Sequence, residues 1–226
     1  MFRADLEKPW LESTCRTFPH PTASPSVAGS HLTIGVLALQ GDVREHELVL
    51  DGLGVSHRHV RIPTDLVGID GLIIPGGESS VIDKLSRIFD VRDPLISAIA
   101  GGLPVLGTCA GLILLASTVI GAIDGQQTFG GLDIEVERNA FGGQVESFET
   151  SIDMPVIAGG PVMAAFIRAP LIRDVRGCSV IATLPNGEIV GVRSGNCVGI
   201  AFHPELVAES RVHEWWLDAV VAGAQR

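Results

Sequence analysis

The chain has 226 residues, of which 46% are hydrophobic and 19% are charged, and its formal net charge is −10. This length and apolar content exclude a disordered chain and favour one α/β unit with a large core. The acidic balance argues against a nucleic acid or an anionic membrane as partner, because both require a basic face.

The first part of the chain differs in composition from the rest. Residues 1–31 carry four prolines and many Ser and Thr residues, without a sustained apolar period. No apolar stretch follows a basic start, as a secretory signal would require. We expect residues 1–31 to be a disordered N-terminal extension and residues 32–226 to form a single domain.

Regular structure is predicted to begin abruptly after this extension. The run Leu32–Leu39 is apolar and rich in branched residues, as a buried parallel strand is. Gln40-Gly41 then turns the chain. Asp42 and Glu45 resemble a capping box at the start of a helix that should end at Gly54. Further predicted elements are strands over Ser56–Ile62 and Gly71–Ile74, a helix over Ser80–Phe89 and another helix before Gly101.

An uncharged run between Asp93 and Asp124 has the hydropathy of a membrane span. Several glycines and Pro104 interrupt this run. A buried strand, Pro104–Leu106, followed by a buried helix is therefore the better interpretation, and no transmembrane segment is expected.

After about Gly130 the pattern changes to short strands joined by hairpin signals at Asn186-Gly187 and Gly195-Asn196. The strands are predicted over Leu132–Glu137, Val145–Ile152, Ser179–Leu184, Ile189–Arg193 and Cys197–Phe202, and a last helix over Ala208–Ala222. Strand–helix units followed by hairpins predict a three-layer α/β fold, with a mixed, mostly parallel sheet and helices on both faces.

The thiols and imidazoles of the chain are scattered. The four cysteines are Cys15, Cys109, Cys178 and Cys197. Since none forms a C-x-x-C pair, we expect a reducing compartment, the cytoplasm, rather than a disulfide framework. His57 and His59 would share one face of a strand but have no further ligand nearby, so neither a metal nor a cofactor is expected.

The sequence Gly107-x-Cys109-x-Gly111 is the cysteine form of a nucleophile elbow. A buried strand precedes it and a helix follows it, which is the context that this motif requires. The thiol would lie at the helix N-terminus, where backbone N–H groups favour a thiolate and an oxyanion. The alternative is a small buried cysteine in a glycine-rich turn.

A base for this thiol is predicted at His203-Pro204-Glu205, at the end of the last strand. An H-x-E spacing on an extended chain points both side chains the same way, so that the carboxylate can fix the tautomer of the imidazole. A lone motif of this kind would more often be a solvated histidine at a strand end. Together with the elbow, however, it predicts a Cys109–His203–Glu205 triad.

These motifs resemble the class I, triad-type glutamine amidotransferases, which hydrolyse glutamine and pass ammonia to a synthase. Further segments resemble one subfamily, the glutaminase subunit of the pyridoxal 5′-phosphate synthase of the ribose-5-phosphate-dependent route. The segments are Leu37-Ala38-Leu39-Gln40-Gly41 with Glu45-His46, Pro75-Gly76-Gly77-Glu78-Ser79, Gly107-Thr108-Cys109-Ala110-Gly111-Leu112, Arg138-Asn139-Ala140-Phe141-Gly142 with Glu146-Ser147-Phe148-Glu149, Phe166-Ile167-Arg168-Ala169-Pro170 and Phe202-His203-Pro204-Glu205-Leu206. The resemblance runs from Leu32 to the C-terminus and implies a flavodoxin-like arrangement of the layers.

The resemblance implies a catalytic role for each matching residue. Cys109 would attack the carboxamide of glutamine and form a γ-glutamyl thioester. His203, held by Glu205, would protonate the departing ammonia. Backbone N–H groups of Gly77 and Ala110 would form the oxyanion hole.

The resemblance also implies a substrate pocket. Its residues would be Gly77, Glu78, Ser79, Arg138, Ile167 and Arg168. A guanidinium group can fork onto the α-carboxylate of glutamine, and Glu78 can accept from the α-ammonium. Whether Arg138 or Arg168 binds the carboxylate stays open. Gln40, at the end of the first strand, is implied as a supporting residue.

The implied partner is a (β/α)8-barrel subunit that makes pyridoxal 5′-phosphate from ribose 5-phosphate, glyceraldehyde 3-phosphate and this ammonia, within a large hetero-oligomer. One alternative is an amidotransferase subunit for another acceptor, such as anthranilate, guanylate or imidazole-glycerol phosphate, which the stretch from Arg138 to Glu149 disfavours. A catalytically idle regulatory subunit is disfavoured by the intact triad. A cysteine peptidase of related fold is disfavoured by Ala110, where such enzymes tend to place a histidine.

Overall fold

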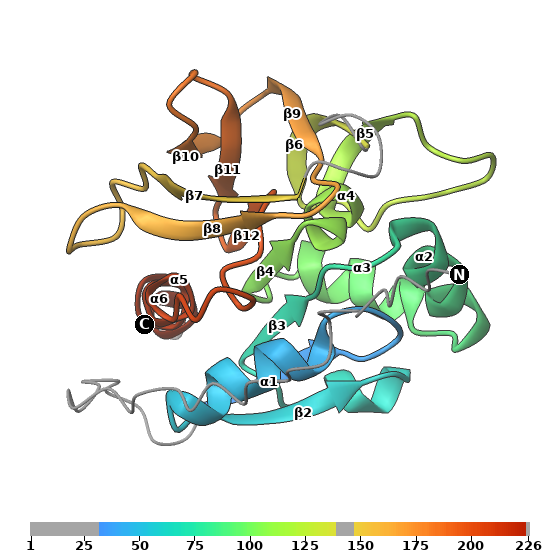
Figure 1. Ribbon diagram of the computed structural model, residues 1–226. Helices are drawn as coiled ribbons and strands as arrows, with labels where there is room; N and C mark the ends of the chain where they lie inside the picture. The colour runs from blue at the N-terminus through green and yellow to red at the C-terminus, as the bar shows by residue number, and fades with distance from the viewer. Residues whose placement is uncertain (1–31, 139–146, 225–226) are drawn as a thin grey trace, which may run out of the picture.

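A seven-stranded sheet forms the centre of the computed structural model, which describes residues 32–138 and 147–224 (Figure 1). Its strands are β1 (Thr33–Leu37), β2 (Ser56–Val60), β3 (Gly71–Ile74), β4 (Val105–Thr108), β10 (Ser179–Thr183), β11 (Ile189–Ser194) and β12 (Cys197–Ile200). They follow the order β10-β11-β12-β4-β3-β1-β2. The five strands from β12 to β2 are parallel, and β10, β11 and β12 pair antiparallel. This arrangement confirms the predicted mixed, mostly parallel sheet.

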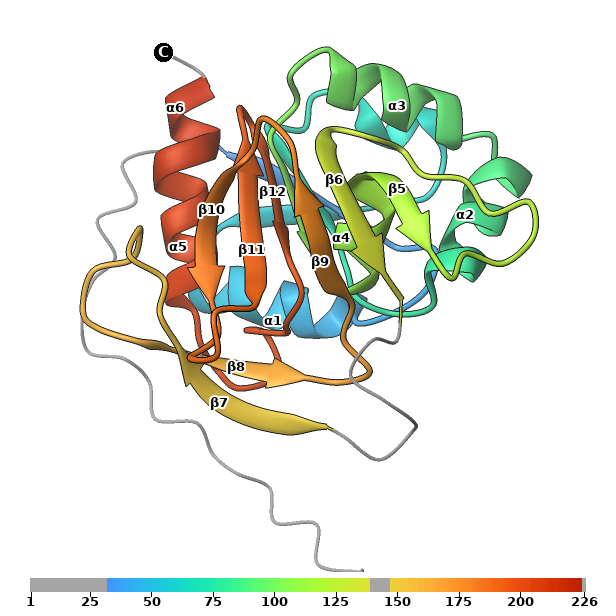
Figure 2. The same cartoon turned by 90° about the horizontal axis from the view of Figure 1, so that it is seen from above.

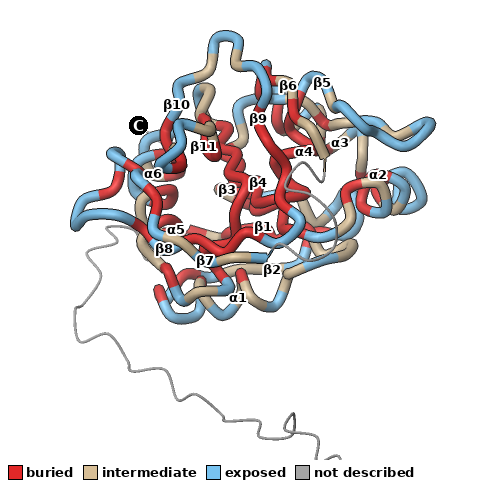
Figure 3. Tube along the Cα trace, turned by 45° about the horizontal axis from the view of Figure 1, so that its top comes forward, coloured by how far each residue is buried: buried red, intermediate tan, exposed pale blue. Residues whose placement is uncertain are grey.

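Helices cover both faces of the sheet, as predicted (Figure 2). One face carries α1 (Val43–Gly52) and the C-terminal helix, which runs through α5 (Arg211–Trp216), one π-helical turn (Leu217–Val221) and α6 (Ala222–Ala224). The other face carries α2 (Ser79–Ile88), α3 (Arg92–Ala100) and α4 (Ala110–Leu115), and a short 3₁₀ turn (Pro63–Leu66) joins β2 to β3. The strands in the middle of these layers, β1, β3, β4 and β12, are almost wholly buried (Figure 3). Their branched apolar residues therefore form the core between the helix layers.

Two smaller sheets extend the hairpin half of the chain. One contains β5 (Ala116–Ile120), β6 (Leu132–Glu137) and β9 (Leu171–Val175), and the other contains β7 (Phe148–Ile152) and β8 (Val162–Phe166). The second sheet reaches the end of β12, because the backbone N–H of His203 donates to the carbonyl of Ala165 at 2.8 Å. The β7–β8 sheet thus helps to fix the position of this histidine.

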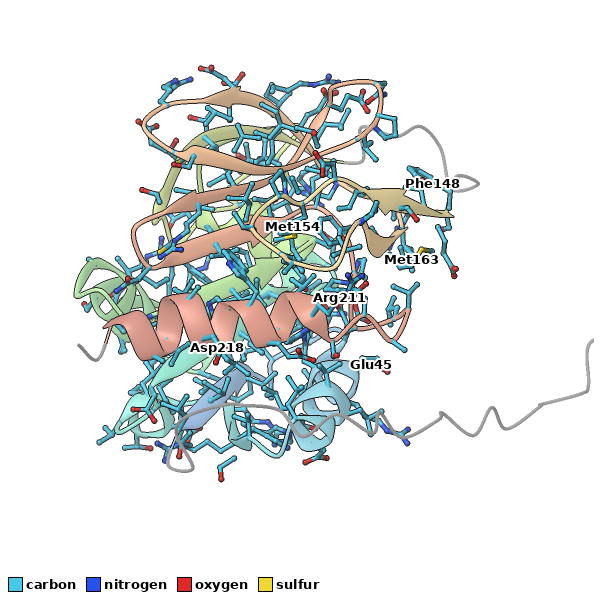
Figure 4. The ribbon with its side chains drawn as sticks, turned by 90° about the vertical axis from the view of Figure 1, so that its left-hand side faces the viewer. Glu45, Phe148, Met154, Met163, Arg211 and Asp218 are labelled. Carbon is cyan, nitrogen blue, oxygen red and sulfur yellow. The ribbon has the colours of Figure 1, made fainter. Side chains whose placement is uncertain are left out.

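The start of the C-terminal helix is tied to β8. Arg211 donates through Nη2 to the carbonyl of Pro161 at 3.0 Å, and Glu209 accepts from the backbone N–H of Met163 at 3.2 Å. Figure 4 shows Arg211 where this helix meets the segment that carries Met154 and Met163. These polar contacts hold α5 and β8 in a common frame on the same side of the molecule.

Several sequence predictions need correction. The helix after the elbow has only six residues and runs directly into β5, so the apolar run continues as a strand. Strands β8 and β9 were not predicted. The last helix begins at Arg211 rather than Ala208, because Ala208 adopts φ +54°. Asp42 is the N-cap of α1, but its side chain makes no capping hydrogen bond, so the predicted capping box is wrong.

Two further predictions concern residues outside the described ranges and the uncharged run between Asp93 and Asp124. The predicted N-terminal extension, residues 1–31, lies outside the described residues, as does the segment 139–146 of the family-like motifs. Within 32–138 and 147–224, no helix has the length and apolar character to span a bilayer.

Candidate active site

Cys109 lies on a sharp turn between β4 and α4, with φ 48° and ψ −98°. This left-handed conformation is uncommon for a residue with a side chain and is typical of a nucleophile elbow. The turn requires small neighbours, since a Cβ atom on Gly111 would lie 2.1 Å from the carbonyl oxygen of Ile74. The backbone N–H of Cys109 donates to the carbonyl of Ile200 at 2.8 Å, which ties the turn to the end of β12.

The predicted base and its carboxylate follow β12 and meet as the sequence pattern indicates. Nδ1 of His203 lies 2.8 Å from Oε1 of Glu205, and both residues are buried. With Nδ1 donating to the carboxylate, Nε2 is the nitrogen left for a partner on the other side of the ring. The thiol of Cys109 is close enough to contribute to the raised pKa of His203. The structure therefore brings Cys109, His203 and Glu205 together.

The electrostatics favour a charged imidazole. Burial opposes a charge on His203, but the hydrogen bonds to Cys109 and Glu205 and the charges of these two groups raise the pKa of His203 to about 11. Burial also raises the pKa of Glu205, and the hydrogen bond and charge of His203 oppose this rise. A charged imidazole next to a thiol is the arrangement that activates a catalytic cysteine.

Asp42 is a residue of this site that the sequence interpretation assigned to a helix cap. Its Oδ2 lies 3.4 Å from Nδ1 of His203. Ligand atoms of Asp42, His203 and Glu205 all lie within 4.8 Å of one another. Because Nδ1 is already engaged with Glu205, this cluster has the geometry of a base held by carboxylates rather than of a ring that presents a lone pair to a cation.

The loop after β3 packs against the histidine and against β1. A Cβ atom on Gly76 would lie 2.3 Å from Cε1 of His203. The side chain of Gln40 accepts from the backbone N–H of Glu78 at 2.7 Å, which holds the loop next to Gly77. On the other side of the site, Ala110 is the first residue of α4 and is buried. Of the two residues predicted for the oxyanion hole, Gly77 thus lies on the loop after β3 and Ala110 lies at the N-terminus of α4, directly after Cys109.

The predicted substrate residues Glu78, Ser79 and Arg138 form one polar cluster. Nη2 of Arg138 donates to Oε1 of Glu78 at 2.6 Å. Gln126, which the sequence interpretation missed, accepts from Nη1 of Arg138 at 2.7 Å and donates to the hydroxyl of Ser79 at 3.0 Å. An amide bridge of this kind fixes the direction of the guanidinium group.

Ile167 and Arg168 follow β8, two and three residues after Ala165, which pairs with His203. Ile167 is 40% exposed, and Arg168 adopts φ +46°. Arg168 is exposed as well.

A family model matches most of the chain. The SNO glutamine amidotransferase family covers residues 36–222. The chain belongs to this family. The sequence resemblance to glutamine amidotransferases is thereby confirmed, and with it the predicted amidotransferase activity.

Relatives agree with this membership. The chain is 52% identical to the pyridoxal 5′-phosphate synthase subunit PdxT of Clavibacter sepedonicus over 199 residues, 88% of this chain and 95% of that protein. It is 48% identical to the protein of the same name from Nocardia farcinica over 211 residues, 91% of this chain and 93% of that protein. A crystal structure described as a glutamine amidotransferase is 43% identical, with a TM-score of 0.77 over 84% of this chain and 98% of that chain. These comparisons confirm the predicted fold class and subfamily.

Proposed function

We propose that this family member is the glutaminase subunit of a pyridoxal 5′-phosphate synthase, with Cys109, His203 and Glu205 as its catalytic triad. The observation that carries the proposal is the strained turn of Cys109 at the start of α4, which is hydrogen-bonded to the end of β12, where the buried His203–Glu205 pair follows. The names and identities of the relatives from Clavibacter and Nocardia support the synthase assignment. Residues 32–226 act as one glutaminase domain.

The reaction begins from the form in which His203 carries the proton and Cys109 is the thiolate. The thiolate of Cys109 attacks the carboxamide carbon of glutamine and forms a tetrahedral intermediate. The imidazolium of His203 then donates its proton to the leaving nitrogen, and ammonia departs. Water, deprotonated by the same ring, hydrolyses the γ-glutamyl thioester to glutamate. Glu205 keeps the ring oriented and stabilises its positive charge throughout.

The negative charge of the intermediate is stabilised by backbone donors. The N–H groups of Gly77 and Ala110 form the oxyanion hole, and Gln40 keeps the loop of Gly77 in place through the N–H of Glu78. The helix dipole of α4 plays a minor part, because this helix has only six residues.

The amino-acid end of glutamine is bound by the polar cluster beside the triad. Glu78 accepts from the α-ammonium, and the guanidinium groups of Arg138 and Arg168 are the two candidate partners of the α-carboxylate. Ser79 and Ile167 complete the pocket. Arg138 is held by Glu78 and Gln126, so substrate binding exchanges part of this network for contacts with glutamine.

The ammonia acceptor is a synthase partner. We assign the partner to the (β/α)8-barrel class, assembled with this chain in a large hetero-oligomer, and place the complex in the cytoplasm. Free thiols agree with that compartment, since Cys109, Cys178 and Cys197 form no disulfide among the described residues.

The proposal is tested by ammonia release from glutamine, measured on the full chain with its co-purified synthase partner. Cys109→Ala is expected to abolish turnover. Cys197→Ala is the matched control, because burial raises the pKa of the Cys197 thiol to about 11 and keeps it unreactive. Activity of the Cys109→Ala variant equal to wild type, or an inactive wild-type complex, would refute the proposal. Ammonia release without pyridoxal phosphate formation would point to another acceptor.

A further inference from the structure

Two histidines outside the proposed triad are completely buried. His46, on α1, and His213, on α5, expose no surface, and Nδ1 of His46 lies 3.0 Å from Nε2 of His213. Burying a polar ring costs free energy unless its nitrogen atoms are partnered, and an apolar side chain would fill the same space without this cost. A role for the two histidines is therefore sought in the groups that lie next to them.

The pair adjoins the carboxylate of Glu205. Nε2 of His46 lies 3.5 Å from Oε1 of Glu205 and 3.2 Å from the hydroxyl of Thr108, the residue before Cys109. The same Oε1 atom lies 2.8 Å from Nδ1 of His203. One carboxylate oxygen therefore lies between two imidazoles, one from the triad and one from α1.

The protonation states of the pair follow from its surroundings. Burial, and then the charges of His213 and His203, lower the pKa of His46 well below its ordinary value, and burial lowers the pKa of His213 to about 4. Both rings are thus neutral at neutral pH, with one proton each. Nε2 of His46 faces two oxygen atoms, the hydroxyl of Thr108, which is its hydrogen-bond partner, and Oε1 of Glu205. A proton on Nε2 is stabilised by both, and Nδ1 is then left to accept from His213.

The surroundings of Nδ1 of His213 agree with this assignment of protons. When His213 donates from Nε2, its Nδ1 carries only a lone pair. This Nδ1 atom is buried and has no hydrogen-bond partner in the part of the chain that the structure describes. A buried lone pair without a partner is less costly than a buried N–H without one.

We propose that His46 is a positioning residue for Glu205: its Nε2–H, directed at the Thr108 hydroxyl and the carboxylate, stabilises the charged carboxylate, and His213 fixes this tautomer by donating to Nδ1. The inference rests on the proposed function, because it assigns a role in the same triad. A neutral donor suits this place better than a cation, since it orients the carboxylate without competing with the imidazolium of His203 for its charge.

Removal of this donor has a defined electrostatic consequence. Oε2 of Glu205 is buried and without a hydrogen-bond partner among the described residues, so the carboxylate has few donors to lose. The titratable groups that face Glu205 are His203, His46 and Asp42, and His213 lies behind His46. Burial already raises the pKa of Glu205. Loss of a nearby N–H donor leaves the charged carboxylate less stabilised, so we expect the triad to lose its carboxylate at a higher pH.

The test uses the full chain with its synthase partner and measures kcat, KM and the pH profile of kcat/KM for His46→Leu and His46→Gln. The Leu variant is expected to lose about 10- to 100-fold in kcat with KM within about threefold. Its acid limb should move to higher pH by about half a unit or more, and its thermal midpoint should not fall. The Gln variant, whose amide can donate to Glu205, should recover most of the lost rate.

His59→Gln is the matched control, since this half-exposed histidine also pairs with a carboxylate, that of Glu47. It should leave every parameter unchanged. A His46→Leu variant with wild-type kcat overturns the inference. A lower kcat that is accompanied by a lower thermal midpoint, with the acid limb of the kcat/KM profile unchanged, also overturns it. If this variant does not fold, His213→Leu gives the second test, and an unchanged kcat there overturns the inference. An inactive wild-type complex would instead refute the proposed function.

Discussion

Replacing Gly76 by Ala should disable the site through a single methyl group. The new Cβ atom would lie 2.3 Å from Cε1 of His203 and 2.7 Å from Oδ2 of Asp42. A relaxed carbon–carbon contact needs about 3.5 Å or more, so either the imidazole or the loop must retreat by roughly 1 Å. A displacement of this size in a catalytic group costs about 100-fold in rate. We therefore expect kcat for glutamine hydrolysis to fall about 100-fold.

The assay is steady-state ammonia release by the complex with the synthase partner, together with the thermal midpoint of each variant. Gly52→Ala is the matched control, because a Cβ atom at this last residue of α1 meets nothing within 4 Å. It should retain wild-type kcat and gain up to about 1 kcal/mol of stability, as alanine does over glycine in a helix. A Gly76→Ala variant within threefold of wild-type kcat would show that the loop does not press on the catalytic ring, and the reasoning would fail.

Two further predictions concern the groups around this loop and behind the triad. Gln40→Ala removes the acceptor of the Glu78 N–H, and kcat/KM should fall about tenfold, or about 1.4 kcal/mol, in the same assay; an unchanged kcat/KM would contradict the supporting role. His213→Gln should reduce the loss of stability in acid, measured by urea unfolding between pH 7 and pH 4. The folded-state pKa of His213 is depressed from 6.5 to about 4, so the unfolded chain gains a proton first and stability falls as pH drops through this window. The variant should lose roughly 3 kcal/mol less than wild type, and equal losses would refute the neutral buried state.

The central sheet and the triad could be predicted because their signals are local in sequence. The apolar runs of β1 and β3 are bounded by turns, and the elbow around Cys109 and the segment from His203 to Glu205 each carry a recognisable spacing within a few residues. Topology then brings them together, since β4 and β12 are parallel neighbours whose carboxyl ends meet at one edge of the sheet.

Other parts of the site depend on contacts that no local pattern reveals. His46 and His213 are 167 positions apart, and Gln126 is 47 positions from Ser79, so neither pairing leaves a periodic signal. Asp42 has the identity and position of a helix cap, but its carboxylate instead faces His203 across the fold. In each case a tertiary contact decides the role of a polar residue that local rules assign differently.

The missed secondary structure has a similar cause. From α4 into β5 the chain stays uncharged without a glycine or proline break, so the sequence does not show where the helix ends at Leu115 and the strand begins at Ala116. Strands β8 and β9, with the sequences VMAAF and LIRDV, do not alternate between apolar and polar residues. These segments are strands because of tertiary pairing: β8 pairs with β7, and β9 pairs with β6.

The account depends on the thiol of Cys109 being the nucleophile that meets glutamine. An electrophilic ketone analogue of glutamine, followed by peptide mapping in a mass spectrometer, tests this claim most directly. The account predicts one adduct, on Cys109, that excess glutamine prevents, while Cys178 and Cys197 stay unmodified. An adduct on either of these two residues, or full loss of activity with Cys109 unmodified, would contradict it.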